Sequence, residues 1–356
     1  MPEITLIIPA AGKSTRFSGE RPKYLRTMPN GDLMLVEAIK HLGIDNISRI
    51  IITVVKEHIE KSKVDLDLIG KRIFELKNII PEFLILDDFT ISQSETIYKT
   101  LITKNVIDGF IIKDCDNLFD FDILHGSTNY VCVSKLQSHT NAINKAYIKL
   151  DKYDNISGII EKTVIGDIFC CGAYAFRNSE TFIKVYEKVL TIKSIEINEI
   201  YISHIIQQMI LDGELFKIQI VNRYVDLGTI DEWNNYTKQF QTLFIDIDGV
   251  LVVNGGEYFE PKWGKCDGLA QNIQAINKLY DSGKATIILT TARKLKYENE
   301  TLNDLCTAGV KYHRIIFDLP HCQRILINDF ADSNMYPSAT AINLERDVDN
   351  LCRFIR

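Results

Sequence analysis

Short apolar runs alternate with amphipathic stretches over the first two thirds of the chain. The apolar runs are rich in isoleucine and valine, as buried strands usually are, and they lie at residues 4–8, 49–55, 83–86, 109–112 and 130–134. The stretches between them have the apolar spacing of helices and lie at 33–42, 56–69 and 94–102. Strands that alternate with helices predict an α/β fold, with a largely parallel sheet and helices on both of its faces.

The last third of the chain repeats this alternation on a smaller scale. A helical stretch at 229–236 ends the first part. The strands predicted after it lie at 242–247, 285–290, 315–317 and 325–327, and the helices at 271–281 and 300–308. A chain of 356 residues is longer than one hydrophobic core usually serves. We therefore predict two domains, residues 1–239 and residues 240–356, with a short connection between them.

The composition is that of a folded protein in water. Hydrophobic residues make up 46% and charged residues 25% of the chain, close to the averages for globular domains. The net charge of −6 does not indicate the basic surface that proteins use to bind a nucleic-acid backbone.

The sequence also lacks the usual signals for a membrane or for secretion. No run approaches the roughly 18 apolar residues of a membrane span, and the first residues do not resemble a signal peptide. The eight cysteines form no Cys-x-x-Cys pair, so we expect free thiols. These features predict a cytoplasmic protein without nucleic-acid or membrane partners, and leave a homo-oligomer open.

A loop of small residues follows the first predicted strand. Residues 9–16 read Pro-Ala-Ala-Gly-Lys-Ser-Thr-Arg. Small residues after a strand let backbone N–H groups approach a triphosphate, and Arg16 and Lys23 can neutralise the charge that develops during phosphoryl or nucleotidyl transfer. The candidate nucleotide-binding residues of this loop are Ala10, Ala11, Gly12, Lys13 and Ser14. The same residues can also form an ordinary turn.

Carboxylates follow another predicted strand, in Lys-Asp-Cys-Asp-Asn at residues 113–117. Mg²⁺ is a hard cation that few carboxylates hold together with substrate phosphate oxygens. The carboxyl ends of parallel strands form the edge of a sheet at which ligands bind. Asp114 and Asp116 are therefore candidates for a magnesium site, although a solvated acidic turn could have the same sequence.

The small-residue loop, the carboxylates at 114 and 116, and the elements described below follow one another along the chain in the same order as the motifs of the sugar-phosphate nucleotidyltransferase family. Residues 1 to about 238 therefore resemble this family. Residues 10–16 resemble the glycine-rich signature of the family, with Ser14 in place of its second glycine. By this resemblance Asp116 is the first metal candidate and Asp114 the second. Asp226, in an Asp-x-Gly-Thr setting, resembles the second metal aspartate.

Two later elements resemble the acceptor-binding part of the same family. One is the pair Glu161 and Lys162, followed by Thr163 where the family usually has proline. The other is a glycine turn at Gly172. Residues Gln93, Ser94 and Glu95 follow the third strand, where family members contact the base and ribose.

The resemblance implies a Rossmann-like mixed sheet and a transfer reaction. An acceptor phosphate oxygen would attack the α-phosphorus of a nucleoside triphosphate as pyrophosphate leaves. Asp116 and Asp226 would hold Mg²⁺, and Lys23 and Arg16 would offset the growing charge. The compact loop favours CTP, with UTP and GTP open. The acceptor would be a phosphorylated sugar or polyol, and the product a nucleotide sugar for polysaccharide synthesis.

A second chemistry is indicated at Asp246 and Asp248, which end an apolar strand and lie on the same side of it because side chains alternate along a strand. One carboxylate can attack a phosphate ester while the other protonates the leaving oxygen. The segment 246–249, Asp-Ile-Asp-Gly, resembles the first motif of the haloacid dehalogenase superfamily. Two carboxylates that merely cap a turn are the simpler alternative.

Further motifs of that superfamily resemble segments downstream. Thr291, with Thr290 as the alternative, would be the hydroxyl residue of the second motif, and Asp329 would hold Mg²⁺ together with Asp246 and Asp248. Either Arg324 or Lys311 could be the basic residue of the third motif.

The intervals between these motifs are too short for a full cap domain, so the resemblance implies a small capless phosphatase domain that acts on a related phosphate monoester. Two alternatives stay open. The second domain could be catalytically inactive beside a single-function transferase, or the whole chain could be a binding protein that senses a nucleotide sugar.

Overall fold

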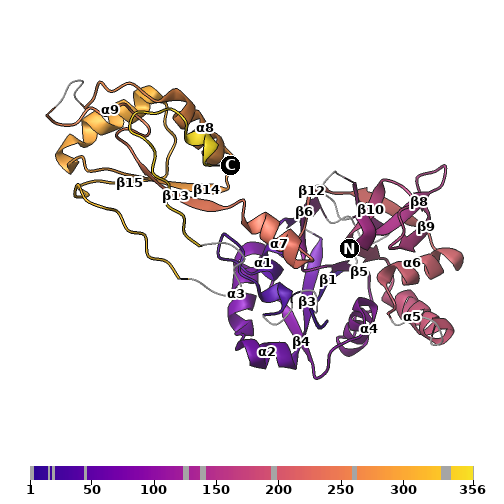
Figure 1. Ribbon diagram of the computed structural model, residues 1–356. Helices are drawn as coiled ribbons and strands as arrows, with labels where there is room; N and C mark the ends of the chain where they lie inside the picture. Colours follow the sequence, from indigo (N-terminus) through magenta and orange to yellow (C-terminus); the bar gives the residue numbers. More distant parts are fainter. Residues whose placement is uncertain are drawn as a thin grey trace. The chain divides into compact units, whose positions relative to one another are not determined.

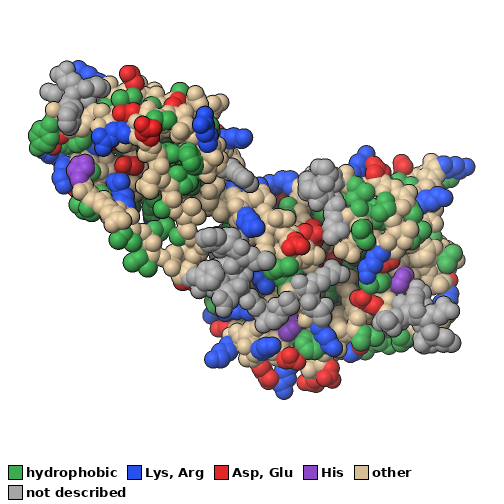
Figure 2. Space-filling view, viewed as in Figure 1, with side chains coloured by type: hydrophobic (Ala, Val, Ile, Leu, Met, Phe, Trp, Pro, Cys, Tyr) green, Lys and Arg blue, Asp and Glu red, His purple; other side chains and the backbone are tan. Residues whose placement is uncertain are grey.

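The structure, a computed structural model, describes residues 4–14, 17, 21–43, 46–122, 128–136, 142–193, 199–258, 263–329 and 338–355. The chain divides into two compact units, Met1–Trp233 and Asn234–Arg356, each built from strands and helices (Figure 1). Within the described residues, no helix combines the length and the apolar character needed to cross a membrane. Basic and acidic side chains are interspersed on the visible face of each unit (Figure 2).

The first unit is built on a mixed sheet with the strand order β11-β7-β10-β5-β1-β3-β4. The central strands run parallel to one another, but β10 runs antiparallel to both of its neighbours. The sheet is therefore mixed, as the family resemblance implies. Parallel pairing, as predicted from the alternation, is found among β5, β1, β3 and β4 and between β11 and β7. The strands of this path are β1 (Ile4–Pro9), β3 (Ile47–Val55), β4 (Glu82–Leu86), β5 (Phe110–Lys113), β7 (Asn129–Lys135), β10 (Ile168–Phe176) and β11 (Phe216–Ile220).

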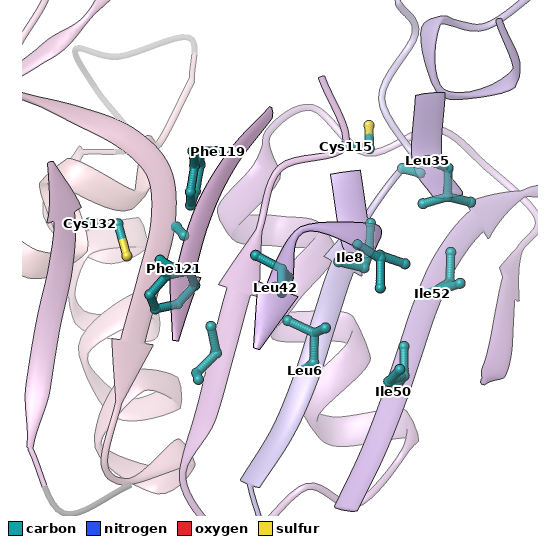
Figure 3. Packing of buried hydrophobic residues seen from close by; sticks show 14 of the residues in the cluster. Leu6, Ile8, Leu35, Leu42, Ile50, Ile52, Cys115, Phe119, Phe121 and Cys132 are labelled. Atoms are coloured by element: carbon teal, nitrogen blue, oxygen red, sulfur yellow. The ribbon is translucent and has the colours of Figure 1, made fainter. Parts of the chain in front are cut away.

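Helices cover both faces of this sheet because the strands are apolar on both sides. Leu6 and Ile8 of β1 point to one face, where they pack with Leu35 of α1 and with strand β3 (Figure 3). Ile7 of β1 belongs to the core on the other face, which α4, α5 and α6 cover. The helices of the unit are α1 (Met34–Lys40), α2 (Lys56–Ser62), α3 (Leu66–Lys77), α4 (Gln93–Thr103), α5 (Ser179–Lys193) and α6 (Ile202–Leu211), with the short helices η1 (Lys23–Leu25) and η2 (Ala142–Asn144).

The single helix predicted at residues 56–69 is wrong, because the structure has two helices, α2 and α3, in this region. Lys63 ends α2 in the left-handed region, with a φ of 50°. Asp65 then starts α3, since its side chain accepts a hydrogen bond from the backbone N–H of Leu68 at 3.1 Å. A carboxylate at this position satisfies a backbone donor of the first helical turn.

Two smaller pieces of sheet complete the first unit. The strands β8 (Ala146–Leu150) and β9 (Ile156–Glu161) form an antiparallel pair that joins the main sheet through β10. A separate sheet has the order β12-β6-β2, with β2 (Leu42–Gly43), β6 (Asn117–Asp122) and β12 (Asn222–Asp226). In it, Asp226 pairs with Asn117, next to the predicted metal residue Asp116.

The second unit has a parallel three-stranded sheet of order β13-β14-β15. Its core contains Ile247, Ile287 and Leu289 from the sheet region and Ile276 from α8. The strands are β13 (Gln241–Asp246), β14 (Ala285–Thr290) and β15 (Arg314–Ile316). The helices are α8 (Ala270–Asp281), α9 (Glu298–Ala308), η3 (Leu295–Tyr297) and η4 (Leu351–Arg353), and α7 (Ile230–Thr237) precedes β13.

The strand predicted at residues 325–327 is wrong. These residues have no regular structure, and Ile325, Leu326 and Ile327 are 74%, 57% and 89% exposed. A strand needs a neighbouring strand to satisfy its backbone hydrogen bonds, and within the described part of the chain none lies beside this run. Three apolar residues alone did not distinguish a strand from a loop.

Candidate active site

A cavity of about 710 Å³ lies in the first unit, within the usual size range of small-molecule sites. Its walls come from the loop after β1, the start of α4, the turn between β5 and β6, the ends of β9 and β12, and β10. Most site residues predicted for this unit line it: Ala10, Ala11, Gly12, Lys13, Ser14, Lys23, Gln93, Asp114, Asp116, Glu161, Lys162, Gly172 and Asp226. The fold thus brings the predicted nucleotide, metal and acceptor elements around one volume.

The loop after β1 takes a backbone conformation that favours glycine. Ser14 has a φ of 52°, in the left-handed region that costs a non-glycine residue about 1–2 kcal/mol. Its carbonyl accepts a hydrogen bond from the N–H of Phe17 at 2.9 Å, which closes the turn. Ser14 therefore adopts a glycine-like backbone at the position where the family resemblance expects glycine. Arg16, predicted to neutralise charge, lies outside the described residues.

The three residues predicted to contact base and ribose lie at the start of α4, and their side chains have different surroundings. The Gln93 side chain faces the cavity and donates to Oδ1 of Asp114. Ser94 is fully buried and donates to the carbonyl of Ile200. Glu95 accepts from the N–H of Ile91 at 2.7 Å, so it completes the cap of the helix. The structure thus places Gln93 in the cavity lining and Ser94 and Glu95 behind it, and a nucleotide contact for each stays a prediction.

Lys23 and Asp116 form an ion pair, with Nζ 2.5 Å from Oδ2. Burial disfavours the charged form of Lys23. The charge and hydrogen bond of Asp116, together with the neighbouring Cys115 and Asp114, outweigh this effect, so the pKa of Lys23 lies above its ordinary value. Burial also opposes the Asp116 carboxylate, yet the Lys23 charge and hydrogen bond hold the pKa of Asp116 below its ordinary value. The two residues are thus a charged pair at neutral pH.

The pKa of Asp114 shifts in the opposite direction to that of Asp116, although the two residues lie only two positions apart in the sequence. Burial and the neighbouring charge of Asp116 raise the pKa of Asp114 to about 7. Gly172 leaves room for it: with a φ of 82°, a Cβ at this position would overlap the Asp114 carboxylate and lie 2.5 Å from Nδ2 of Asn117. The glycine turn predicted to bind the acceptor therefore also shapes the acidic turn.

Lys113, which we did not predict, stabilises the turn that carries Asp114 and Asp116. Its buried ammonium group donates to the carbonyls of Asp114 and Asn117 at 2.7 and 2.8 Å, and to Oδ1 of Asn117 at 2.5 Å. Burial lowers the pKa of Lys113 to about 8. The sequence signal for it is a lysine at the end of an otherwise apolar strand.

Asp116 and Asp226 meet across a glycine. The N–H of Leu227 donates to the carbonyl of Asp116 at 2.8 Å. A Cβ at Gly228 would lie 3.1 Å from both Oδ2 of Asp116 and Oδ1 of Asp226. The two carboxylates therefore flank a small space that glycine leaves free.

This arrangement suits Mg²⁺. Within the described residues, no group of three or more histidine, cysteine or acidic side chains is arranged to hold a metal. Mg²⁺ usually takes one or two carboxylates, together with substrate phosphates and waters. Asp116 and Asp226 provide that number of ligands on either side of the space at Gly228.

The predicted acceptor residues line the cavity at the end of β9 and just after it. Glu161 accepts from Oγ of Ser203 at 2.6 Å. Nζ of Lys162 donates to the hydroxyl of Tyr201 at 2.5 Å and lies 4.5 Å from the centre of the Tyr201 ring. Tyr201 and Ser203 belong to the start of α6 and also line the cavity, and no motif pointed to them. Lys145 is a further unpredicted residue of the lining, and donates to Asp226.

In the second unit, Asp246 ends β13 and contacts Arg324, whose guanidinium nitrogens lie 3.3 and 3.4 Å from the carboxylate oxygens. Burial raises the pKa of Asp246, and Arg324 partly offsets this effect. The other candidate basic residue, Lys311, forms an exposed ion pair with Asp281 at 2.7 Å. The structure therefore brings Arg324, rather than Lys311, to Asp246.

Asp248 is held by a buried arginine that we did not predict. Arg293 is 0% exposed and donates to both Asp248 oxygens, at 2.7 and 2.9 Å. It also donates to Asp304 at 2.9 Å, and its guanidinium lies 5.2 Å from the ring centre of Trp263. Oγ1 of Thr291 donates to Asp248 at 3.4 Å. Thr290, the alternative, donates instead to the carbonyl of Ile245 at 3.3 Å.

Asp329 is the third magnesium ligand predicted for the second unit. It is exposed, and its carbonyl accepts from the hydroxyl of Ser338. Among the described residues, no three acidic, histidine or cysteine side chains are arranged to hold a metal ion. A magnesium site shared by Asp246, Asp248 and Asp329 therefore stays a prediction.

Comparison with known proteins shows the fold of the first unit. No protein-family model and no curated protein matches the chain. Among solved structures, a nucleoside-diphosphate-sugar pyrophosphorylase from Vibrio cholerae RC9 is 18% identical, with a TM-score of 0.55 over 65% of this chain and 98% of that one. A UDP-glucose pyrophosphorylase in complex with UDP-glucose is 14% identical, with a TM-score of 0.51 over 67% of this chain and 99% of that one.

These similarities define a class of fold. About 65% of the chain has the nucleotidyltransferase fold of the sugar pyrophosphorylases, a share close in size to the first unit. The resemblance of the second unit to the haloacid dehalogenase superfamily rests on its sequence motifs.

Proposed function

We propose that the first unit is a sugar-phosphate nucleotidyltransferase. It joins the nucleotidyl group of a nucleoside triphosphate to a phosphorylated sugar or polyol and releases pyrophosphate. One observation carries this proposal: a single cavity joins the loop around Gly12, the ion pair of Lys23 and Asp116, and the facing Asp226. The pyrophosphorylase fold of this part of the chain agrees with it.

The residues have distinct tasks in this reaction. An oxygen of the acceptor phosphate forms a bond to the α-phosphorus, and the bond from that phosphorus to the β-phosphate bridging oxygen breaks, so pyrophosphate leaves with the electron pair. Lys23 binds the phosphates and offsets the charge that develops. Glu161 and Lys162 orient the acceptor. Mg²⁺ would be held by Asp116 and Asp226 and would neutralise phosphate charge.

CTP is the nucleotide we favour, because the loop from Pro9 to Lys13 is compact and resembles that of cytidylyl-transferring relatives. UTP and GTP are the alternatives. The acceptor class is a small phosphorylated sugar or polyol, and the product would serve polysaccharide synthesis.

A screen of substrates tests the transferase. The full chain is incubated with each of the four nucleoside triphosphates and a panel of sugar and polyol phosphates with Mg²⁺, and pyrophosphate and inorganic phosphate are measured separately. We expect pyrophosphate release that requires one triphosphate and one acceptor together. Tight binding of a nucleotide sugar without any pyrophosphate release would instead identify a sensing protein.

For the second unit we propose a phosphatase that acts on a related phosphate monoester. The observation that favours it is the grouping of Asp246 with Arg324, and of Asp248 with Thr291, after β13. In this reaction an oxygen of Asp246 forms a bond to phosphorus as the ester oxygen leaves with a proton from Asp248. Water then gives a proton to Asp248 and attacks phosphorus, the bond to Asp246 breaks, and phosphate leaves.

The test is the near-isosteric variant Asp246→Asn in the full chain. We expect it to stop phosphate release from the monoesters of the same panel while pyrophosphate release continues. Equal phosphate release by the wild type and this variant would favour the alternative, a second unit without catalysis.

A further inference from the structure

Lys145 is a mostly buried cation in the wall of the cavity that none of the recognised motifs contains. Its side chain is only 11% exposed. Its carbonyl accepts a hydrogen bond from the N–H of Lys162 at 2.9 Å, and the next residue, Ala146, pairs with Glu161 across β8 and β9. The backbone therefore places Lys145 directly beside the two predicted acceptor residues.

Three neighbours surround the ammonium group of Lys145. Nζ donates to Oδ2 of Asp226 and to the hydroxyl of Tyr224, the latter at 2.8 Å. It also lies 5.2 Å from the ring centre of Tyr224 and 5.7 Å from that of Phe169. Aromatic faces attract cations, so this pocket holds an ammonium ion in a defined place next to Asp226.

The two candidate metal ligands are therefore each paired with a lysine, Asp116 with Lys23 and Asp226 with Lys145. A divalent cation between these carboxylates would lie close to two ammonium ions and be repelled by both. Substrate phosphates carry the negative charge that would attract these lysines away from the carboxylates. Metal and phosphate binding are thus linked through the lysines.

We propose that Lys145 is a substrate-binding residue that exchanges partners. It neutralises Asp226 in the metal-free protein, and it binds the phosphate of the acceptor once a divalent cation occupies Asp226. This inference rests on the proposed transferase function of the cavity. Lys23 follows the nucleotide loop and Lys145 adjoins the acceptor strands, so the two lysines divide the two substrates between them.

Two binding measurements on the full-length variant Lys145→Met test this exchange. Mn²⁺, which replaces Mg²⁺ and is visible by electron paramagnetic resonance, is titrated alone. Inorganic phosphate is then titrated by calorimetry with Mn²⁺ at saturation. We expect Mn²⁺ to bind about tenfold more tightly than to the wild type, and phosphate about tenfold more weakly, the scale of one charge-assisted hydrogen bond.

Two further variants serve as controls. Lys149→Met removes an exposed lysine of β8, the strand that begins just after Lys145, and should leave both dissociation constants unchanged. Lys145→Arg keeps the positive charge and should restore phosphate binding. Circular dichroism verifies that each variant is folded.

Changes of opposite sign distinguish the exchange from a structural role. Weaker binding of both Mn²⁺ and phosphate by Lys145→Met would overturn the proposal, because it would mean that the residue supports the site as a whole. Unchanged Mn²⁺ affinity or unchanged phosphate affinity would overturn it as well. Failure of the proposed transferase function shows separately, as an absence of pyrophosphate release by the wild type in the substrate screen.

Discussion

Asp116 and Asp226 face each other across Gly228, with one oxygen of each carboxylate 3.1 Å from the point that a Cβ of residue 228 would occupy. The two aspartates come from different elements. Asp116 lies in the turn before β6, and Asp226 ends β12, which pairs with β6. The small sheet that joins these strands therefore assembles the acidic pair.

We predict that Asp116→Ala and Asp226→Ala each abolish pyrophosphate release while phosphate release by the second unit stays nearly unchanged. The reason is that both aspartates belong to the first unit and provide the carboxylates that a divalent cation needs. Separate assays of pyrophosphate and phosphate test this. Equal loss of both activities would contradict two independent sites.

Gly172 gives a second prediction. Its φ of 82° disfavours any side chain, and a Cβ would overlap Asp114 and crowd Asn117. Gly172→Ala should lower the free energy of unfolding by about 1–3 kcal/mol and also reduce pyrophosphate release. The matched control is Gly166→Ala, where a Cβ would have no atom within 4 Å. Urea unfolding measures both, and equal stability of the two variants would show that the Asp114 turn adapts.

Ser14 gives a third prediction, because it already has a left-handed backbone. Ser14→Gly should keep pyrophosphate release and should not lower stability, since glycine adopts this conformation without steric cost. Ser14→Val should lower stability relative to the wild type, because β-branched residues fit this region worse than serine does. Thermal unfolding and initial rates test both. A loss of activity in Ser14→Gly would show instead that the hydroxyl group contacts the substrate.

The sequence predicted those residues of the cavity wall that follow directly after a recognisable strand. Asp116 and the loop at Gly12 follow apolar strands, and the ends of such strands are where sites form. The sequence did not predict Lys145, because its partner Asp226 lies 81 residues away along the chain, in a strand that pairs with β6. Long-range pairing of this kind cannot be read from periodicity.

Two other differences have physical reasons as well. Ser94 belongs to a segment expected to contact the nucleotide. Its hydroxyl is buried and donates to the carbonyl of Ile200, which precedes α6, and a contact between segments so far apart in the sequence cannot be read from periodicity. The run 325–327 has the composition of a strand but lacks a pairing partner in the described structure. Composition gives the propensity of a segment, whereas its neighbours decide whether a strand forms.

Asp114 gives a prediction on pH. Its pKa of about 7 in the folded protein is far above the usual value of about 4 for an unfolded chain. Between these values the folded state binds more protons, so stability falls as the pH rises from about 4 to 7. Asp114→Asn removes this loss and should therefore stabilise the protein more at pH 8 than at pH 5.

Urea unfolding at both pH values, without divalent cations, measures the effect of Asp114→Asn. Asp108→Asn, at an exposed position of the same unit, is the control for the loss of one carboxylate. An equal effect of Asp114→Asn at both pH values would mean that the pKa of Asp114 is not raised in the folded protein.

The last prediction concerns Arg293, whose guanidinium is fully buried between Asp248 and Asp304. Arg293→Met would leave two carboxylates without their partner, and breaking a buried ion pair in this way usually costs about 3–5 kcal/mol. In contrast, Lys311→Met removes an exposed ion pair with Asp281, which is worth less than about 1 kcal/mol.

The fluorescence of Trp263, which lies 5.2 Å from the Arg293 guanidinium, reports unfolding of the second unit in a Trp233→Phe background. We expect Arg293→Met to shift the urea midpoint of this signal strongly downward and Lys311→Met to leave it nearly unchanged. Equal midpoints for the two variants would mean that the buried network contributes no more stability than a surface ion pair.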